Sequence, residues 1–248
     1  MAGHSKWANI KHRKAAQDKK KGKVFTRCIR EIMSAARQGG GDLKSNSLLR
    51  KAVDTAKAEN MTADVIERAI KRGTGELKSA DYVEVVFEGY APGGVAVVVK
   101  SLTDNNTRTV ANVRSYFNKY SGTLGTEGSV AWMFDYKATF YYPTTVAAED
   151  AVLEVALEAG AEDLVTLGDI YRIQAAPADF AAVKAALEAK FGKAEEADFE
   201  YLPKQWQPVT ELEKAQTIQK LLQLLEDDDD VQTVTSNMDL SAELAAQL

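Results

Sequence analysis

The chain has 248 residues, of which 45% are hydrophobic and 27% are charged. This composition is typical of a folded globular protein and excludes a disordered, collagen-like or disulfide-scaffold chain. Its single cysteine, Cys28, can form neither an intrachain disulfide nor a thiolate metal cluster. The longest apolar run, residues 94–99, is far shorter than the roughly 20 residues of a membrane-spanning helix. We therefore expect a cytoplasmic protein that is not inserted in a membrane.

Charge is distributed very unevenly along the chain. Residues 1–78 hold 19 Lys/Arg against 8 Asp/Glu, a balance of +11, whereas residues 79–248 hold 12 against 28, a balance of −16. Such asymmetry is typical of a segment that binds a polyanion. The alternative is a solvated basic tail with no partner. We favour polyanion binding, because an acidic protein does not need a basic tail for its solubility.

The basic character begins in a predicted flexible arm, residues 1–23, and continues into a predicted helix. Its lysines and arginines suit phosphate contacts, and Trp7 offers a ring for stacking. From residue 23 to residue 37, apolar residues recur at helical spacing while Arg27 and Arg30 share another face. The predicted inward positions are Phe25, Cys28, Ile29, Ile32, Met33 and Ala36. The candidate nucleic-acid-binding residues are Lys6, Trp7, Lys11, His12, Arg13, Lys14, Lys19, Lys20, Lys21, Lys23, Arg27 and Arg30.

Two more helices are predicted after the glycine run at residues 39–41, at about residues 45–59 and 62–72. With the first helix they form an expected three-helix domain over residues 24–78. The short turn between the last two is similar to a helix-turn-helix, in which Arg68, Lys71 and Arg72 would face DNA. The alternative is a helical hairpin that only packs. We favour packing, because few side chains suited to reading bases line the second helix.

The pattern changes to alternating β-branched residues from residue 81 onward. Strands are predicted at residues 82–88 and 95–101, and another at 129–134. Between them a polar loop, residues 103–109, leads into a helix that ends near residue 120. Helix capping explains part of this loop, and a surface for a partner would explain the rest. The candidate partner-surface residues are Thr103, Asp104, Asn105 and Arg108.

The next stretch has the order βαββαβ, which is typical of a ferredoxin-like unit. Its predicted elements are strand 138–142, helix 146–159, strands 163–166 and 170–175, helix 177–190 and strand 196–202. A strand near 207–209, helix 210–226, strand 231–235 and helix 239–247 follow. We therefore predict an α+β fold: an N-terminal three-helix domain and two α/β, ferredoxin-like domains, with residues 137–203 inserted into a discontinuous domain of residues 79–136 and 204–248.

No group of residues has the pattern of a catalytic or metal site. The glycines at 122, 125 and 128 follow a helix, so they do not fit a dinucleotide-binding loop. Both histidines lie in the basic arm, where a general base could hardly be positioned. Cys28 has basic neighbours, but its apolar spacing favours packing. The acidic run 227–230 at a predicted helix end is locally unfavourable, which hints at a basic partner. We expect no enzyme activity, cofactor, metal or small-molecule substrate.

Several blocks of sequence resemble the YebC/PmpR family. The longest is the opening MAGHSKWANIKHRKAAQD, and others are EGYAPGG at 88–94, LTDN at 102–105, GTLG at 122–125 and LEDDDDVQ at 225–232. The resemblance implies a three-domain, cytoplasmic, non-enzymatic protein. Two positions depart from it: Asn106-Thr107 stands where the family often has Arg-Asn, and Thr235 where an aromatic residue is usual. The first removes a positive charge from the polar loop and weakens a nucleic-acid role for that loop.

The family resemblance and the charges leave two functions open. The family is mostly described as DNA-binding transcriptional regulators, for which a homodimer would supply two basic arms. Related members act in translation, including a mitochondrial translational activator of cytochrome oxidase and factors that relieve stalled ribosomes. In that case the arm would bind ribosomal or transfer RNA on the ribosome. We place DNA-binding transcriptional regulation first and ribosome-associated translation second.

Overall fold

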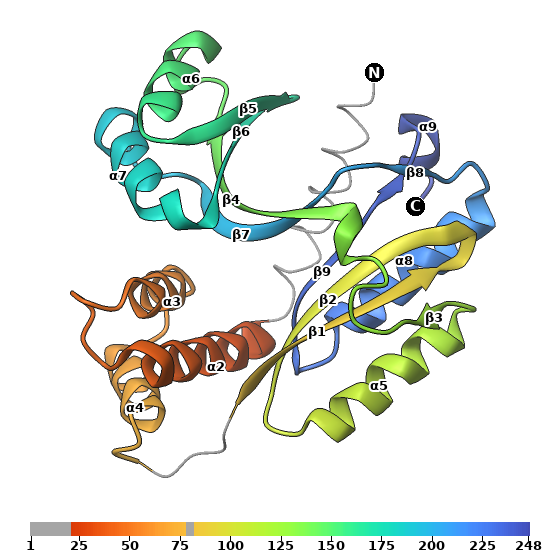
Figure 1. Cartoon of the computed structure of the whole chain (residues 1–248), viewed down its shortest axis with the longest axis horizontal. Coiled ribbons are helices and arrows are strands. Elements are labelled where there is room, and N and C mark those ends of the chain that lie inside the picture. The colour runs from red at the N-terminus through yellow and green to blue at the C-terminus, as the bar shows by residue number, and fades with distance from the viewer. Residues whose placement is uncertain (1–20, 78–81) are drawn as a thin grey trace.

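The computed structural model describes residues 21–77 and 82–248, with side chains from residue 24 onward (Figure 1). In this part of the chain, three helices are followed by two four-stranded antiparallel sheets with helices packed on them. The α+β class expected from the sequence is confirmed. No helix among these residues combines the length and the apolar character that crossing a bilayer requires.

The helical domain consists of three helices: α2 (Lys21–Gly39), α3 (Ser47–Ala58) and α4 (Ala63–Gly73). The buried Asn46 ties two of them together. Its Oδ1 accepts a hydrogen bond from the backbone N of Leu49 (2.9 Å) and so caps α3. Its Nδ2 donates to the carbonyls of Ala35 and Gly40 (both 2.8 Å) at the end of α2. One side chain therefore sets where α2 ends and where α3 begins.

The hairpin of α3 and α4 packs on α2. A DNA-binding helix-turn-helix also packs on its domain, so the preference for packing alone stays a prediction. Gly73 allows the close approach of α4, because a Cβ there would lie 2.5 Å from the Met33 carbonyl oxygen. On the outer side of α4, Lys71 pairs with Glu67 (Nζ–Oε1 2.6 Å). Phe25 is an exception to the predicted inward face, since it is 37% exposed. The buried core is Cys28, Ile32, Met33, Ala35, Ala36, Leu49, Ala52, Val53, Ala56, Met61, Ile66 and Ala69.

The central domain is built from two separate parts of the chain. Its sheet has the order β3-β1-β2-β9, with antiparallel neighbours throughout. The first part contributes β1 (Val83–Ala91), β2 (Val95–Thr103), α5 (Asn106–Lys119) and β3 (Thr123–Leu124). The second contributes β8 (Gln207–Pro208), α8 (Leu212–Glu226), β9 (Val231–Ser236), β10 (Met238–Asp239) and α9 (Ala242–Ala245). The short β8 and β10 pair with each other in parallel.

The intervening residues form the predicted βαββαβ unit. Its elements are β4 (Phe134–Pro143), α6 (Glu149–Glu158), β5 (Ala161–Leu167), β6 (Ile170–Ala175), α7 (Phe180–Phe191) and β7 (Glu196–Pro203). The sheet order β5-β6-β4-β7 is that of a ferredoxin-like fold. The first and last strands, β4 and β7, are neighbours, and Phe134 pairs with Pro203 where the unit joins the central domain.

Each face of the central sheet is covered by different elements. Alternate β-strand residues such as Val97 and Val99 pack with α5 and α8 in one core. Their neighbours Ala96 and Val98 pack on the other face with Phe134 and its surroundings, at the base of the inserted unit. Figure 1 shows α2–α4 and the inserted unit as separate bodies beside this sheet. The central sheet is therefore the part on which the other two are mounted.

The strand predicted at residues 129–134 is wrong, and Glu88 gives the physical reason. This carboxylate is 4% exposed and accepts hydrogen bonds from the backbone N atoms of Gly128, Val130 and Ala131, each at 2.7 Å. Those N–H groups are therefore unavailable to a strand partner. The loop curls around Glu88, residues 131–133 form a 3₁₀ turn, and β4 starts only at Phe134. The glycine at 128 has φ +81°, which suits this curl.

We predict that Glu88→Gln destabilises the central domain by about 3 kcal/mol, because an uncharged amide oxygen cannot satisfy three buried donors. Burial opposes ionisation of Glu88, but the three backbone bonds outweigh it and hold the pKa below its ordinary value. The contribution of ionised Glu88 to the free energy of unfolding is therefore complete above the pKa of the unfolded state. It is lost as the pH falls through the pKa of the folded state. Urea unfolding over a pH series should show the difference between wild type and variant shrinking in acid.

The control for this experiment is Glu84→Gln on the same strand. Glu84 is half exposed and pairs with Lys100 (Oε2–Nζ 3.2 Å), so its loss should change the free energy of unfolding by less than about 1 kcal/mol. Equal effects of the two substitutions would contradict the role given to Glu88.

Candidate nucleic-acid interface

The described part of the basic region begins on α2, and its two candidate arginines face the central domain. Arg27 Nη2 donates to the carbonyl of Val231 (3.4 Å). Arg30 Nη1 donates to the Asp229 carbonyl and forms an ion pair with Asp230 Oδ1 (2.9 Å). The side chain of Arg30 is only 11% exposed. The structure thus places Arg30 against the acidic loop between α8 and β9, and Arg27 against Val231, the first residue of β9.

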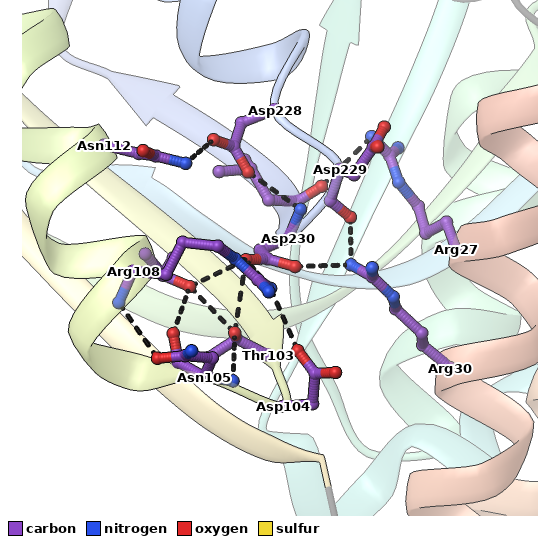
Figure 2. A network of polar contacts seen from close by, with 12 residues as sticks. Arg27, Arg30, Thr103, Asp104, Asn105, Arg108, Asn112, Asp228, Asp229 and Asp230 are labelled. Carbon is purple, nitrogen blue, oxygen red and sulfur yellow. Dashed lines mark hydrogen bonds and ion pairs between the residues drawn. The ribbon is translucent and has the colours of Figure 1, made fainter. Parts of the chain in front are cut away.

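The acidic loop is held by the chain's own polar groups (Figure 2). Asp228 Oδ2 accepts from Asn112 Nδ2 (3.1 Å) and from the Tyr116 hydroxyl (2.9 Å), both on α5. Asp228 Oδ1 also accepts from the backbone N of Asp230 (2.9 Å). Burial and the bond to Asp228 raise the pKa of Tyr116 to about 12, so the phenol remains a donor at neutral pH. The loop is therefore held by contacts within the central domain that do not involve α2.

The Asp230 carboxylate divides its two oxygens between two domains. Oδ2 accepts from Arg108 Nη2 (2.7 Å), the Thr109 hydroxyl (2.7 Å) and the Thr103 hydroxyl (3.2 Å), all within the central domain. Oδ1 faces Arg30 of the helical domain. Burial opposes ionisation of Asp230, but the hydrogen bonds from Arg108 and Thr109 and the neighbouring arginine charges outweigh it, so its pKa is lowered. Asp230 is thus a buried, fully charged hub.

The polar loop before α5, residues 103–109, supplies hydrogen-bond donors to Asp230. Thr103 is buried, so the expectation that it belongs to an exposed partner surface is wrong. Asn105 caps α5 by accepting from the backbone N of Arg108 (3.1 Å). Arg108 also pairs with Asp104 (Nη2–Oδ1 2.9 Å). Thr103, Arg108 and Thr109, whose side chains helix capping does not explain, therefore bind Asp230 of the acidic loop. Asp104, Asn105 and Arg108 keep an exposed side.

A second charged contact joins the helical domain to the inserted unit. Lys51 Nζ on α3 bonds to Asp198 Oδ1 on β7 and lies 4.8 Å from the centre of the Phe199 ring. Glu31 of α2 lies in the same region. Burial and the negative charge of Asp198 raise the pKa of the Glu31 carboxyl, and the positive charge of Lys51 opposes this rise. Charged groups of the helical domain and the inserted unit therefore meet at one junction.

Other sequence expectations are placed as follows. Cys28 is buried in the helical core, and burial and Glu31 raise its pKa to about 12, so packing rather than reactivity describes it. The remaining candidates for nucleic-acid binding precede residue 24, where the described side chains begin, and their role stays a prediction. They are Lys6, Trp7, Lys11, His12, Arg13, Lys14, Lys19, Lys20, Lys21 and Lys23.

Sequence reasoning missed the pairing of Asp230 with Arg30 and of Lys51 with Asp198. A signal for the first existed, because four consecutive aspartates at a helix C-terminus are unfavourable unless cations compensate them. In the described structure, Asp230 of this run pairs with this chain's own Arg30 and Arg108, and an external basic partner stays a prediction. No comparable local signal marks Lys51 or Asp198.

Comparison with known proteins places this architecture in a family. A family model described as the TACO1/YebC protein N-terminal domain matches residues 5–76, and one described as the TACO1/YebC second and third domain matches residues 82–238. The chain belongs to the TACO1/YebC family. The resemblance stated from the sequence blocks is thereby confirmed. The Arg30–Asp230 contact joins the two matched parts of this TACO1/YebC chain.

Relatives of known name are similar over their whole length. A protein of Magnetococcus marinus named a probable transcriptional regulatory protein is 52% identical over 249 aligned positions, covering 100% of this chain and 99% of that one. One of the same description from Thermotoga petrophila is 49% identical, covering 97% and 94%. The crystal structure of a conserved hypothetical protein from Aquifex aeolicus is 41% identical, has a TM-score of 0.82, and covers 89% of this chain and 91% of that one. The TACO1/YebC fold is therefore shared with a solved structure.

We predict that Asp230→Asn lowers the free energy of unfolding by about 3–5 kcal/mol, because it leaves the Arg108 charge and the Thr109 hydroxyl without their anionic partner in a buried setting. Asp169→Asn, which removes the same charge from an exposed turn, should cost less than about 0.5 kcal/mol. Urea unfolding at neutral pH measures both. An Asp230→Asn protein as stable as wild type would show that the hub does not hold the TACO1/YebC central domain together.

Proposed function

We propose that this chain is a regulator of gene expression that binds nucleic acid, acting on DNA as a transcriptional regulator. The observation that carries the proposal is the charge balance of +11 in residues 1–78 against −16 in the remainder. Phosphate contacts supply most non-specific affinity for nucleic acid, and they need cations gathered in one segment. The names of the relatives from Magnetococcus marinus and Thermotoga petrophila support a role in transcription.

The cations of the proposed interface run from residue 6 to the first turns of α2. Because α2 begins at Lys21, the cations at 19, 20, 21 and 23 directly precede or open a helix that is packed in the core of the helical domain. This arrangement suits backbone contacts that position a duplex rather than contacts that read bases. On α4, Arg68 is exposed, but Lys71 is engaged by Glu67, so this helix adds little base-reading capacity.

A second candidate is a ribosome-associated translation factor that binds ribosomal or transfer RNA. The acidic balance of residues 79–248 favours it, since an acidic body repels naked nucleic acid but suits the basic proteins of a ribosome. The same arm would serve both functions, because phosphate chemistry is common to DNA and RNA. Neither function requires a catalytic step.

We predict that replacing Lys19, Lys20, Lys21 and Lys23 by Gln weakens binding to a DNA duplex and flattens its salt dependence. The slope of log K against log salt concentration should fall by about 0.9 for each phosphate that the variant no longer neutralises. Fluorescence anisotropy at several salt concentrations measures both effects. The matched control neutralises four exposed lysines of the described part of residues 79–248: Lys119, Lys190, Lys193 and Lys220.

The control should keep the wild-type slope, since those lysines lie outside the proposed interface. If a chain lacking residues 1–23 bound DNA and RNA as tightly as the full chain, the proposed interface would be wrong. Two separate measurements distinguish the functions. In the first, DNase-treated lysate is sedimented through sucrose. In the second, DNA fragments bound to the protein are recovered after crosslinking, without DNase. Sedimentation with ribosomes supports translation, and enrichment of defined promoter fragments supports transcription.

A further inference from the structure

The helical domain is docked on the rest of the protein by charged contacts. Its own hydrophobic cluster draws on α2, α3 and α4 and reaches no further than Tyr82 among the described residues. The hydrogen bonds and ion pairs described above that leave the domain come from the cations Arg27, Arg30 and Lys51, and they end on carbonyl oxygens or carboxylates. An interface of this kind has less hydrophobic stabilisation than a packed core, so a change of ionic partner can release it.

The Asp230 carboxylate is arranged so that the helical domain can leave at low cost. Its Oδ2 remains with Arg108, Thr109 and Thr103, which belong to its own domain. Only Oδ1 faces Arg30. When Arg30 departs, Asp230 therefore keeps a guanidinium partner and is not left as an isolated buried charge, which is the costly outcome for a broken ion pair.

Arg30 itself is incompletely satisfied in the docked position. Its Nε is buried without a hydrogen-bond partner in the described structure. Its guanidinium carbon lies 5.2 Å from the centre of the Tyr82 ring. A phosphate can accept two parallel hydrogen bonds from one guanidinium, with stronger charge assistance than a carbonyl oxygen gives. A phosphate of a polyanion thus offers an acceptor for Arg30 Nε, which has no hydrogen-bond partner in the docked position.

We propose that the acidic loop, residues 227–230, is an internal competitor for the arginine face of α2, and that a polyanion which binds Arg27 and Arg30 displaces it and undocks the helical domain. This inference rests on the proposed nucleic-acid binding and adds its regulation. The docked state is then an autoinhibited state, in which the chain's own carboxylate and carbonyl oxygens occupy a phosphate-binding surface. Any contact that strengthens docking must weaken polyanion affinity by the same factor.

The Lys51–Asp198 contact allows this coupling to be tested without altering α2 or the acidic loop. Asp198→Asn removes the charge that faces Lys51 but keeps the oxygen that accepts from the backbone N of Phe199. Docking should weaken, and the affinity for a mixed-sequence DNA duplex should rise about fivefold. The matched control is Glu158→Gln, which removes the same charge from an exposed position on α6 of the same inserted unit and should change affinity less than about twofold.

Docking itself is measured by the distance between two spin labels on the full chain. Cysteines are introduced at Asp54 on α3 and Lys220 on α8, both exposed, while the buried Cys28 stays unlabelled. Adding the duplex should lengthen the label separation, and Arg30→Gln should lengthen it without any duplex. Lys51→Gln provides a second variant for the label measurement if Asp198→Asn proves poorly folded.

Three outcomes are distinguishable. Longer separation on adding duplex, together with the affinity gain of Asp198→Asn over Glu158→Gln, supports the inference. Binding of the duplex with an unchanged separation and no affinity gain overturns the inference and leaves the proposed function standing. Failure of the full chain to bind either the duplex or a single-stranded RNA of equal length overturns both.

Discussion

The need to compensate one buried negative charge organises the structure. Asp230 is 3% exposed and ionised, so its two oxygens must find cations or donors. Arg108 and Thr109 approach one oxygen from α5, and Arg30 approaches the other from α2. This requirement fixes the α8–β9 loop, the start of α5 and the position of the helical domain together. The acidic loop, residues 227–230, is therefore where the helical domain contacts the central domain.

Glu88 obeys the same rule on the opposite face of the central sheet. It fills a ring of backbone N–H groups in a glycine-containing loop, which would otherwise attract an anion. Both carboxylates therefore occupy sites with the chemistry of phosphate binding. Glu88 is enclosed by donors of its own domain, whereas one oxygen of Asp230 serves a different domain. This difference underlies the proposal that the Asp230–Arg30 contact is exchanged for a polyanion, whereas the Glu88 contacts stay within one domain.

Much of the fold follows from local patterns, and the candidate site does not. Helical spacing of residues such as Ile32 and Ile66 predicts the three-helix domain, and the order of elements predicts the inserted βαββαβ unit. The strand predicted at 129–134 fails because Glu88, about forty residues earlier in the chain, takes its backbone donors. Arg30 and Asp230 are 200 residues apart, so no local spacing shows that they meet. Amphipathic spacing shows that Arg30 lies outside the apolar face of its helix, but it does not show which residue Arg30 contacts.

The adjacency of β4 and β7 has a consequence for how the chain assembles. β2 and β9 are neighbours in the central sheet although the whole inserted unit lies between them in sequence. Closing a disordered loop of that length carries an entropic cost that grows with the number of free residues. Once the inserted unit has folded, Phe134 and Pro203 are held at one strand spacing, about 4.8 Å, and only residues 104–133 and 204–230 still separate β2 from β9. Prior folding of the inserted unit therefore lowers the entropic cost of pairing β2 with β9.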